Sequence, residues 1–584
     1  MTVPQRDLAG SARTSLSDGV GPVAQDSSGA QVKSMRSTDG SKTGFTRAEI
    51  NEVTIVEQKT GQLKDFSMLA MVGLAYAILN SWVAMAASLN LSLPSGGPVA
   101  TLWGLVISAI GNISMAASLA EICHVFPSSG GPYHWSAILS PPRYANAISW
   151  CCGWFAWAGW TALVATTGSL AGGLLTGMYA LAHPDYEVKD WQIFVIYLGY
   201  ILIATVINLY GSRLLPLVNS AAIIWSLAGA LIIIITCLAC ASPNYQTGTF
   251  VFGTYLNQSG WNNGVAYILG LLQSSFGLIG IDALSHMVEE VPQPHINIPN
   301  AMLLAVTIGA SSSFVVLVCL LFVMKDYDAV VSSAAGSLLE ILYQATGNVA
   351  GAICLQVFPL VAMEFAAQGI LCACSRMTHA FARDHGLPFS KFFSKLNPRT
   401  GVPDRAVILT SVLVIIFGLI YLGSSSALNA ILSSSVVFLN VSYCIPIALL
   451  LFRGRHLLRP ESFPEPTWTL GPILGPVANS IALAFTVFTT VFFLFPPDLP
   501  VTPSNMNYAV AVFGIVFIFS ALTWFVQGRH TFTGPRDLGG LFELARAEVD
   551  RGEIHPKSHP HSRSSSHHRG HGHGHGRDEE KTEA

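Results

Sequence analysis

Apolar stretches about twenty residues long alternate with short polar segments along most of the chain. A helix of about 20 mainly apolar residues crosses the hydrocarbon core of a bilayer, so each stretch predicts a membrane-spanning helix. Twelve stretches qualify, at residues 66–90, 98–121, 146–180, 191–210, 215–240, 264–287, 300–324, 349–374, 405–422, 427–451, 475–496 and 507–527. We therefore predict an all-α integral membrane domain over residues 63–528. The polar segments 1–62 and 529–584 predict disordered tails.

Composition supports a membrane protein and argues against other classes. Hydrophobic residues make up 51% of the chain and charged residues 11%, with a mean hydropathy of +0.51. Soluble domains carry about 25% charged residues. The net charge of -3 favours no nucleic-acid partner. The ten cysteines lie mostly inside apolar stretches without paired CxxC spacing, so they predict packing residues rather than metal ligands.

Basic residues in the loops between the predicted spans are strongly one-sided. Only Lys189 and Lys325 lie on one side. The other side holds Arg143, Arg213, Arg376, Arg383, Lys391, Lys395, Arg399, Arg405, Arg453, Arg455 and Arg459. Because basic loops stay on the cytoplasmic side, both termini are predicted to be cytoplasmic. The plasma membrane is the predicted location, and the vacuolar membrane is the alternative.

Two peripheral features suggest modification or metal binding. Asn257 is the predicted glycosylation site, because the sequons at Asn112 and Asn440 lie within spans and Asn90 abuts a helix end. An unmodified Asn257 is the alternative. The C-terminal tail, from His555 onwards, holds eight of the seventeen histidines. It predicts a solvated tail, with adventitious metal binding as the alternative.

The chain lacks the motifs of several chemical classes. It has no GxxxxGK[ST] phosphate loop, and no HExxH or GxSxG element stands at a membrane face. It also has no filter-like segment, which argues against a channel. These absences leave an intramembrane enzyme and a channel as weak alternatives to a secondary transporter. Such a carrier draws on ion gradients and on a membrane potential worth about 2.3 kcal/mol per charge per 100 mV. It needs no cofactor, catalytic residue or metal.

Two of the predicted spans are interrupted. The first contains Asn80–Ser81 near its centre, and the sixth contains SSFGLIGID, from Ser274 to Asp282. Secondary transporters bind substrate near the bilayer midplane at interrupted helices, where unwound backbone frees N–H and C=O groups. The two interruptions are five spans apart, as an inverted repeat of five helices each requires. We therefore expect residues 274–280 to be an unwound binding segment.

Several longer segments are similar to one superfamily of carriers. FGLIGIDALSHMVEEVPQPHINIPNAM (residues 276–302) resembles the sixth helix and following loop of the amino acid–polyamine–organocation (APC) superfamily. EICHVFPSSGGPYHWSAILSPPRYA (residues 121–145) resembles the loop after its second helix. ILNSW, FARDHGLPFSKFFSKLNPRTGVP and FPPDLPVTPSNMNYA are similar to the fungal amino acid/choline transporter branch, which includes choline and γ-aminobutyrate permeases. The resemblance covers about residues 60–528.

The resemblance implies a five-plus-five inverted repeat with broken helices one and six and two added helices. It also implies proton- or potential-linked uptake of small amines or amino acids across a fungal membrane. Substrate is expected between the two broken helices, with contributions from helices three and eight.

Two acidic residues within the predicted spans are candidates for proton coupling or gating. Asp282 follows the second interruption, and a lone charge within a span costs roughly 2.5–3.5 kcal/mol, which favours a functional role. The resemblance aligns it with an acidic position that helps coupling or gating. Its alternative role is to cap the resumed half-helix. Glu364 forms a polar stripe with Gln356 and Gln368 in the eighth span, with interhelical hydrogen bonding as the alternative.

The predicted substrate-binding residues lie mostly at the interruptions. Main-chain contacts are expected from Asn80, Ser81, Ser274, Ser275, Gly277 and Gly280. By resemblance Phe276 is an aromatic lid, or alternatively a core residue. Trp154, Trp157 and Trp160 recur every three residues; Trp157 is the predicted cation–π contact, with placement at the headgroups as the alternative.

Three further acids lie at the predicted inner side. Glu289 and Glu290 are expected to pair with basic residues of the inner loops. Glu121 ends the second span, before a glycine- and proline-rich loop predicted to be part of the inner gate.

The sequence thus predicts a proton-coupled importer of a small amine or amino acid, such as choline or γ-aminobutyrate, in a lipid bilayer. One alternative is a carrier, including an exporter, of a specialised metabolite. The other is a non-transporting nutrient sensor on the same fold, against which the short, unpatterned N-terminal tail argues.

Overall fold

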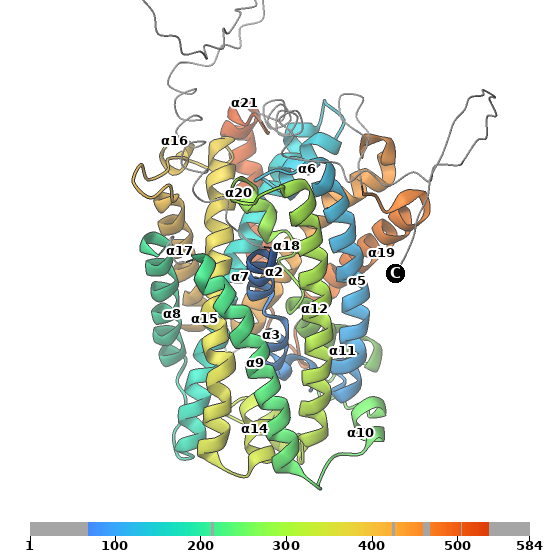
Figure 1. The fold of residues 1–584 in the computed structure, drawn as a ribbon, viewed down its shortest axis with the longest axis vertical. Coiled ribbons are helices and arrows are strands. Elements are labelled where there is room, and N and C mark those ends of the chain that lie inside the picture. The colour runs from blue at the N-terminus through green and yellow to red at the C-terminus, as the bar shows by residue number, and fades with distance from the viewer. Residues whose placement is uncertain (1–67, 212–214, 423–426, 459–467, 504, 536–584) are drawn as a thin grey trace, which may run out of the picture. The chain divides into compact units, whose positions relative to one another are not determined.

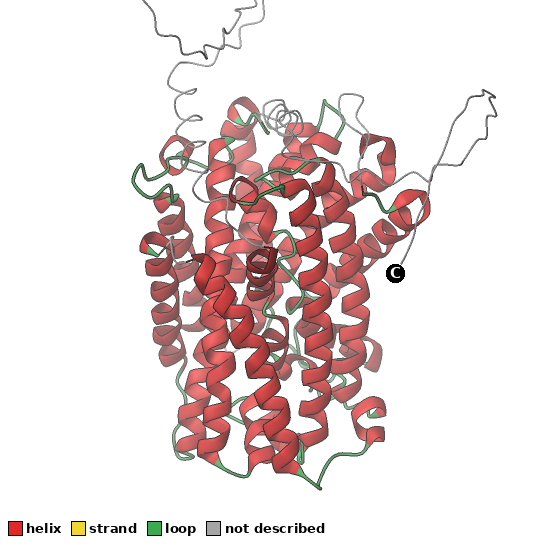
Figure 2. Cartoon of the chain, in the orientation of Figure 1, coloured by secondary structure: helices red, strands yellow, loops and turns green. Residues whose placement is uncertain are grey.

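The computed structural model describes residues 68–211, 215–422, 427–458, 468–503 and 505–535. These residues are helical, and their only β pairing is an isolated bridge between Ser95 and Asn257 (Figure 2). The predicted N-terminal tail, the His-rich segment, Arg213 and Arg459 lie outside the described residues. The prediction of an all-α protein with many membrane spans is confirmed.

Ten helices of the described chain are long and apolar enough to cross a membrane. They are α5 (Gly97–Val125), α7 (Ala145–Ala182), α8 (Asp190–Tyr210), α9 (Leu215–Ala241), α12 (Pro294–Val323), α15 (Val349–Arg383), α17 (Asp404–Gly418) continued by η3 (Leu419–Leu422), α18 (Ala427–Arg453), α19 (Gly471–Phe492), and α20 (Ala509–Thr523) continued by η5 (Trp524–Gly528) and α21 (Arg529–Thr531). The last helix therefore continues three residues beyond the boundary predicted at residue 528.

The first and sixth predicted spans are each divided into two helical pieces. The first consists of α2 (Met68–Leu79) and α3 (Ser81–Ala87), and the sixth of α11 (Asn263–Phe276) and η2 (Ala283–Glu290). Short helices connect the spans: α4 (Leu89–Ser92), α6 (Pro132–Leu139), α10 (Gly248–Gly253), α13 (Tyr327–Ser332), α14 (Ser337–Thr346), α16 (Ser390–Phe393) and η4 (Arg455–Leu458). Both interruptions thus fall in the spans where the sequence predicts them.

The long helices run side by side between two ends (Figure 1). One end carries α6, α16 and α21 and is called the α6 end; the other carries α10 and α14 and is called the α14 end. Nine of the eleven basic residues predicted on the inner side are described, and they lie in the loops, short helices and helix ends at the α6 end. Lys189 and Lys325 lie in loops at the α14 end. We predict that the α6 end faces the cytoplasm.

Glycines allow α7 to approach its neighbours closely. The ring of Tyr197, on α8, is fully buried between Gly168 of α7 and Gly418 of α17, and its hydroxyl donates to the Val414 carbonyl at 2.5 Å. A Cβ atom on Gly168 would lie 2.6 Å from the Tyr197 ring. Small residues at such contacts let membrane helices gain dispersion energy, since lipid leaves no hydrophobic force between them.

We expect Gly168→Ala to lower the thermal unfolding temperature of the purified protein, because the added methyl group displaces Tyr197 from its hydrogen bond. Overpacking of this kind costs about 1–3 kcal/mol. Gly173→Ala is the matched control on the same helix, since a Cβ atom there meets nothing within 4 Å. Equal unfolding temperatures for the two variants would contradict this account of α7 packing.

Candidate functional site

The first interruption is a single residue in a left-handed conformation. Asn80 has φ 41° and ψ 42°, a conformation that asparagine adopts more readily than most residues. Its side-chain amide donates to the carbonyl of Ala362 on α15 at 3.1 Å, and its side-chain oxygen accepts from Ser226 on α9 at 3.4 Å. The side chain of Asn80 therefore fixes the interruption between two neighbouring helices.

The second interruption begins later than the sequence predicts. Ser274 and Ser275 lie in the last turn of α11, and the non-helical segment covers residues 277–282. The Ser274 hydroxyl lies 2.8 Å from that of Ser108 on α5, so this side chain faces the second span. Gly280 has φ +88°, which only glycine adopts without strain. The prediction of an unwound segment over residues 274–280 is therefore wrong at its start, because the hydrogen bonds of α11 continue to Phe276.

The two interruptions pack against each other. A Cβ atom on Gly277 would lie 3.2 Å from the carbonyl oxygen of Ser81, and one on Gly280 would lie 3.7 Å from Ile78. Gln273 donates from its side-chain amide to the carbonyl of Met85 at 2.6 Å. The glycines thus bring peptide groups of one interruption next to those of the other.

This paired region also contains buried groups that make few hydrogen bonds. The Ser81 hydroxyl is fully buried and bonds to no residue that the structure describes. The amides of residues 280–282 make no backbone–backbone hydrogen bond within the described chain, and those of Gly280 and Asp282 interact with the Tyr443 hydroxyl instead. Buried polar groups normally have partners, so the Ser81 hydroxyl and the Ile281 amide are the groups in this region that could bond to a small polar solute.

Asp282 lies at the end of the second interruption and is fully buried. The Tyr443 hydroxyl, from α18, donates to its Oδ1 atom, and the His286 Nε2 atom lies 3.1 Å from its Oδ2 atom. The carboxylate makes no capping hydrogen bond to η2. The alternative that Asp282 serves as a helix cap is therefore wrong, because tyrosine and histidine occupy both of its oxygens.

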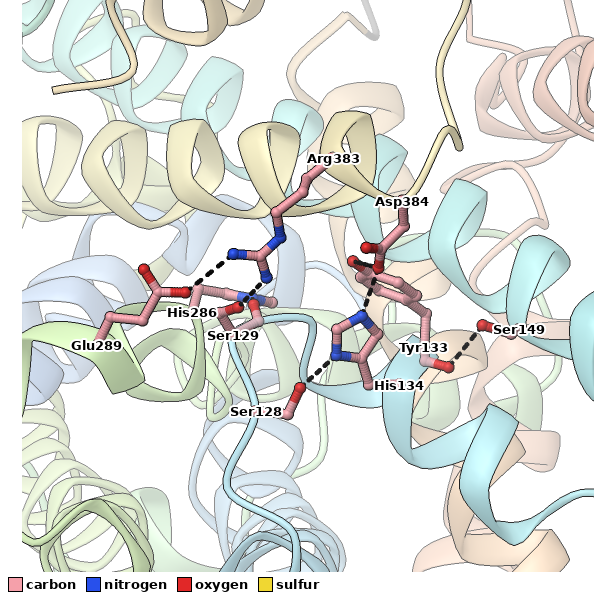
Figure 3. A network of polar contacts seen from close by, with 9 residues as sticks. All are labelled: Ser128, Ser129, Tyr133, His134, Ser149, His286, Glu289, Arg383 and Asp384. Atoms are coloured by element: carbon pink, nitrogen blue, oxygen red, sulfur yellow. Dashed lines mark hydrogen bonds and ion pairs between the residues drawn. The ribbon is translucent and has the colours of Figure 1, made fainter. Parts of the chain in front are cut away.

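A polar network joins the interrupted sixth helix to the α6 end (Figure 3). Arg383, at the end of α15, donates to Glu289 at 3.1 Å and to the Ser129 hydroxyl at 3.0 Å. The next residue, Asp384, accepts from Tyr133 at 2.9 Å and contacts His134 Nε2 at 2.5 Å. The segment between α5 and α6 is thus held to η2 and to α15.

The ion pairs of this network agree with the expectation for Glu289 and Glu290. Arg376 contacts Glu290 at 2.6 Å, and Arg383 contacts Glu289. Glu121, which is buried, pairs with Arg455. All three acids are therefore paired with arginines at the α6 end.

Other predicted residues are not brought to the interruptions. Glu364 interacts electrostatically with Tyr200 of α8, whereas Ala362 is the α15 residue that contacts the first interruption. The side chains of Glu364, Gln356 and Gln368 make no hydrogen bond within the described ranges. The Trp157 indole donates to Thr378 at 3.0 Å. The roles predicted for Glu364 and Trp157 stay predictions.

The positions of Phe276 and Asn257 are defined, and the roles predicted for them stay predictions. Phe276 is buried at the last turn of α11, directly before the second interruption. Asn257 lies near the α14 end, where its side-chain nitrogen donates to Trp261 at 2.7 Å and to Asn263 at 3.1 Å. A glycan on this nitrogen would displace one of these two hydrogen bonds. Glycosylation of Asn257 stays a prediction.

Sequence reasoning missed several residues around the interruptions. Tyr443 gave no local signal, because it belongs to a distant span. His286 did have a local signal, because it lies four residues after Asp282 on a helical segment, where two such side chains are neighbours. The Trp160 ring, rather than that of Trp157, approaches the Gly280 position at 3.6 Å. Gly131 (φ +55°) comes within 3.7 Å of Asp282 at its Cβ position, which accounts for a glycine in the α5–α6 segment.

Comparison with known proteins places the chain in a family of membrane permeases. The amino acid permease family matches residues 66–518. The chain is 37% identical over 475 residues to a choline transporter of Saccharomyces cerevisiae, covering 80% of this chain and 82% of that protein. It is 30% identical over 490 residues to the amino-acid permease BAT1 of Arabidopsis thaliana, covering 81% and 93%. It is 30% identical over 472 residues to the swainsonine transporter swnT of Arthroderma benhamiae, covering 80% and 92%.

We expect Tyr443→Phe to destabilise the purified protein, because it leaves one oxygen of a buried carboxylate without its donor. The cost of an unsatisfied buried group is about 1–3 kcal/mol, and more when it is charged. Tyr144→Phe is the control, since Tyr144 is exposed and its ring stays available to Arg143. The thermal unfolding temperatures of the two variants are to be compared. A Tyr443→Phe protein as stable as the Tyr144→Phe control would contradict a stabilising role of the hydrogen bond from Tyr443 to Asp282.

Proposed function

The chain belongs to the amino acid permease family, and on that premise we propose that it is a proton-coupled carrier that imports a small amine or amino acid. Family membership makes it a multi-span membrane permease rather than an enzyme. The substrate, the coupling ion and the direction of transport are the proposed part.

The observation that carries this proposal is the contact between the two helix interruptions beside a buried carboxylate. Unwound peptide groups offer both donors and acceptors to a solute, and lipid cannot satisfy them. The Gly277 position meets the Ser81 carbonyl, and Asp282 follows five residues later. Phe276, Ser81, Gly277 and Gly280 are the residues that we propose contact substrate. Asn80, Ser274 and Ser275 support them, since their side chains bond to neighbouring helices.

A small organic cation or zwitterion is the proposed substrate class. A choline transporter is among the similar proteins, and choline carries a quaternary ammonium group. The Trp160 Cη2 atom lies 3.6 Å from the Cβ position of Gly280, and an ammonium that reached the face of this ring would gain about 2 kcal/mol when water is excluded. Choline and γ-aminobutyrate are therefore the first candidates.

Proton coupling is assigned to Asp282 rather than to Glu364. Asp282 adjoins the interruption and connects through His286 to the α5–α6 segment. Glu364 interacts electrostatically with Tyr200 of α8 and makes no side-chain hydrogen bond within the described ranges. A proton bound at Asp282 can therefore influence both substrate binding and the α6 end, whereas Glu364 has no comparable path among the described contacts.

Alternating access is proposed to open the α6 end. In this structure the Arg383–Glu289 and Arg376–Glu290 pairs fasten α15 to η2. On the α14 side a cavity of about 20 Å³ lies between α4, α11 and α18, lined by Leu272 and Asn429 among others. The ion pairs would break when substrate is released toward the cytoplasm, if the α6 end is the inner one. We propose the plasma membrane as the location, with cytoplasmic termini.

One observation favours a second candidate function. A similar protein is named as a swainsonine transporter, which favours the alternative of a carrier for a specialised metabolite. The same interrupted helices would serve such a substrate, in either direction. An uptake screen that finds a specialised amine in place of choline or γ-aminobutyrate would favour this candidate.

We expect cells that express the chain to accumulate labelled choline, γ-aminobutyrate or a basic amino acid faster at acidic than at neutral external pH. Asp282→Asn removes the titrating group and is expected to abolish the pH dependence and lower accumulation by roughly ten-fold, equal to about 1.4 kcal/mol. Asp185→Asn, in an exposed loop, is the control for expression and surface delivery. The proposal of a proton-coupled importer would be contradicted if the unaltered protein showed no uptake, or uptake that did not depend on pH.

A further inference from the structure

His286 lies between two groups that accept hydrogen bonds. Its Nδ1 atom is 3.0 Å from the backbone oxygen of Ser129, and its Nε2 atom is 3.1 Å from Oδ2 of Asp282. A backbone carbonyl oxygen can only accept, so the Nδ1 atom must carry a hydrogen. Both side chains of the His286–Asp282 pair are fully buried.

The hydrogen on Nδ1 determines how many protons the pair holds. A neutral imidazole has one N–H group. If Nδ1 uses it for Ser129, the lone pair of Nε2 faces an ionised Asp282, and two acceptors repel at this distance. The contact requires one more proton, on Nε2 or on the carboxyl. Tyr443 does not supply it, because its hydroxyl already donates to the other carboxylate oxygen.

A second histidine in the same network shows the contrast. His134 contacts Asp384 through Nε2 and the Ser128 hydroxyl through Nδ1. A hydroxyl can donate as well as accept, so a neutral His134 satisfies both partners. The additional proton is therefore specific to His286, whose second partner is a carbonyl.

The position of Ser129 links this proton to the α6 end. Ser129 belongs to the segment between α5 and α6, and its hydroxyl accepts from Arg383 of α15. The same segment fits against η2 at Gly131, where a Cβ atom would lie 2.6 Å from the Ser285 hydroxyl. Without its additional proton, His286 can donate to Ser129 or to Asp282 but not to both. Only the contact with Ser129 joins η2 to the α5–α6 segment, because Asp282 lies at the start of η2 itself. An ionised carboxylate accepts a stronger hydrogen bond than a carbonyl, so loss of the proton leaves the remaining N–H group with Asp282 and releases Ser129.

Titratable groups lie on each element that packs against the pair. Tyr443 of α18, Cys123 of α5 and Cys152 of α7 interact electrostatically with Asp282. The other elements packed against η2 are α15, α12 and α2. Their titratable or charged residues at or nearest this end are Arg376, His379, Arg383, His295 and Tyr76. The arginines of α15 are committed to Glu289 and Glu290, which leaves Asp282 as the carboxylate that contacts His286.

We propose that the His286–Asp282 pair holds one shared proton while the α6 end is closed, and that release of this proton frees the α5–α6 segment and opens that end. The proton leaves to solvent at the α6 end, and the net charge of the pair changes from zero to minus one. This inference rests on the proposed proton-coupled transport. It assigns the coupling proton to Asp282 and His286 and links the release of this proton to opening of the α6 end.

Transport by two matched variants tests the link to opening. The His286→Gln side chain donates to Ser129 without titrating, so the ratio of uptake at acidic to neutral pH should fall to about one and accumulation against a gradient should be lost. His134→Gln alters the other histidine of the network and should keep the ratio of the unaltered protein, even at a lower rate. If His286→Gln keeps that ratio and still moves protons with substrate in liposomes, the proposal is overturned.

A spectroscopic measurement on the full-length protein in bilayers needs no substrate. At neutral pH we expect either the imidazolium nitrogen signals of His286 in ¹⁵N-histidine spectra or a carboxylic-acid C=O infrared band from Asp282. His286→Gln and Asp282→Asn identify these signals by their loss. Absence of both overturns the shared proton even where uptake is proton-coupled. Their presence in a protein that transports none of the amines tested overturns the proposed function and leaves the shared proton standing.

Discussion

The contact between the two interrupted helices is the constraint on which the rest of the structure depends. A peptide group inside a bilayer finds no water, so each departure from helical hydrogen bonding must be enclosed by protein. Gly277 and Gly280 permit the close approach of the two interruptions, while Asn80 and Gln273 bond to neighbouring carbonyls. The helices around them, α5, α7, α12 and α15, enclose this pair of defects, and the polar groups left over are those available to a solute.

Ion pairs and hydrogen bonds hold the elements together at the α6 end, whereas close side-chain packing holds them together in the interior. Close glycine contacts such as Gly168 with Tyr197 give the interior one tight arrangement. At the α6 end, by contrast, arginines, acids and histidines connect α15, η2 and the α5–α6 segment. Polar links of this kind have alternative partners and can be exchanged one for another, whereas packed rings cannot. Movement is therefore easier to accommodate at the α6 end than in the middle of the bundle.

The sequence was sufficient for features that depend on local pattern. Runs of apolar residues located the spans, and Asn80 and Gly280 located both interruptions, because asparagine and glycine adopt left-handed backbone more readily than most residues. It was insufficient where distant residues meet. Tyr443 and Ser129 reach the Asp282–His286 pair from other elements, and no spacing rule connects them. Which tryptophan of α7 approaches the second interruption also depends on helix rotation, which an all-apolar segment does not reveal. The start of the second interruption was misplaced because Ser274 and Ser275 bond to α5 while remaining helical.

Gly131 has a consequence for how such proteins can diverge. Its φ of +55° and its closeness to Ser285 and His286 leave no room for a side chain. The α5–α6 segment and the start of η2 are therefore fitted to each other although about 150 residues separate them in the chain. In a chimera that took only one of these segments from a relative, the α5–α6 segment and η2 would no longer pack closely against each other. The two segments would therefore have to be exchanged together to preserve their contact.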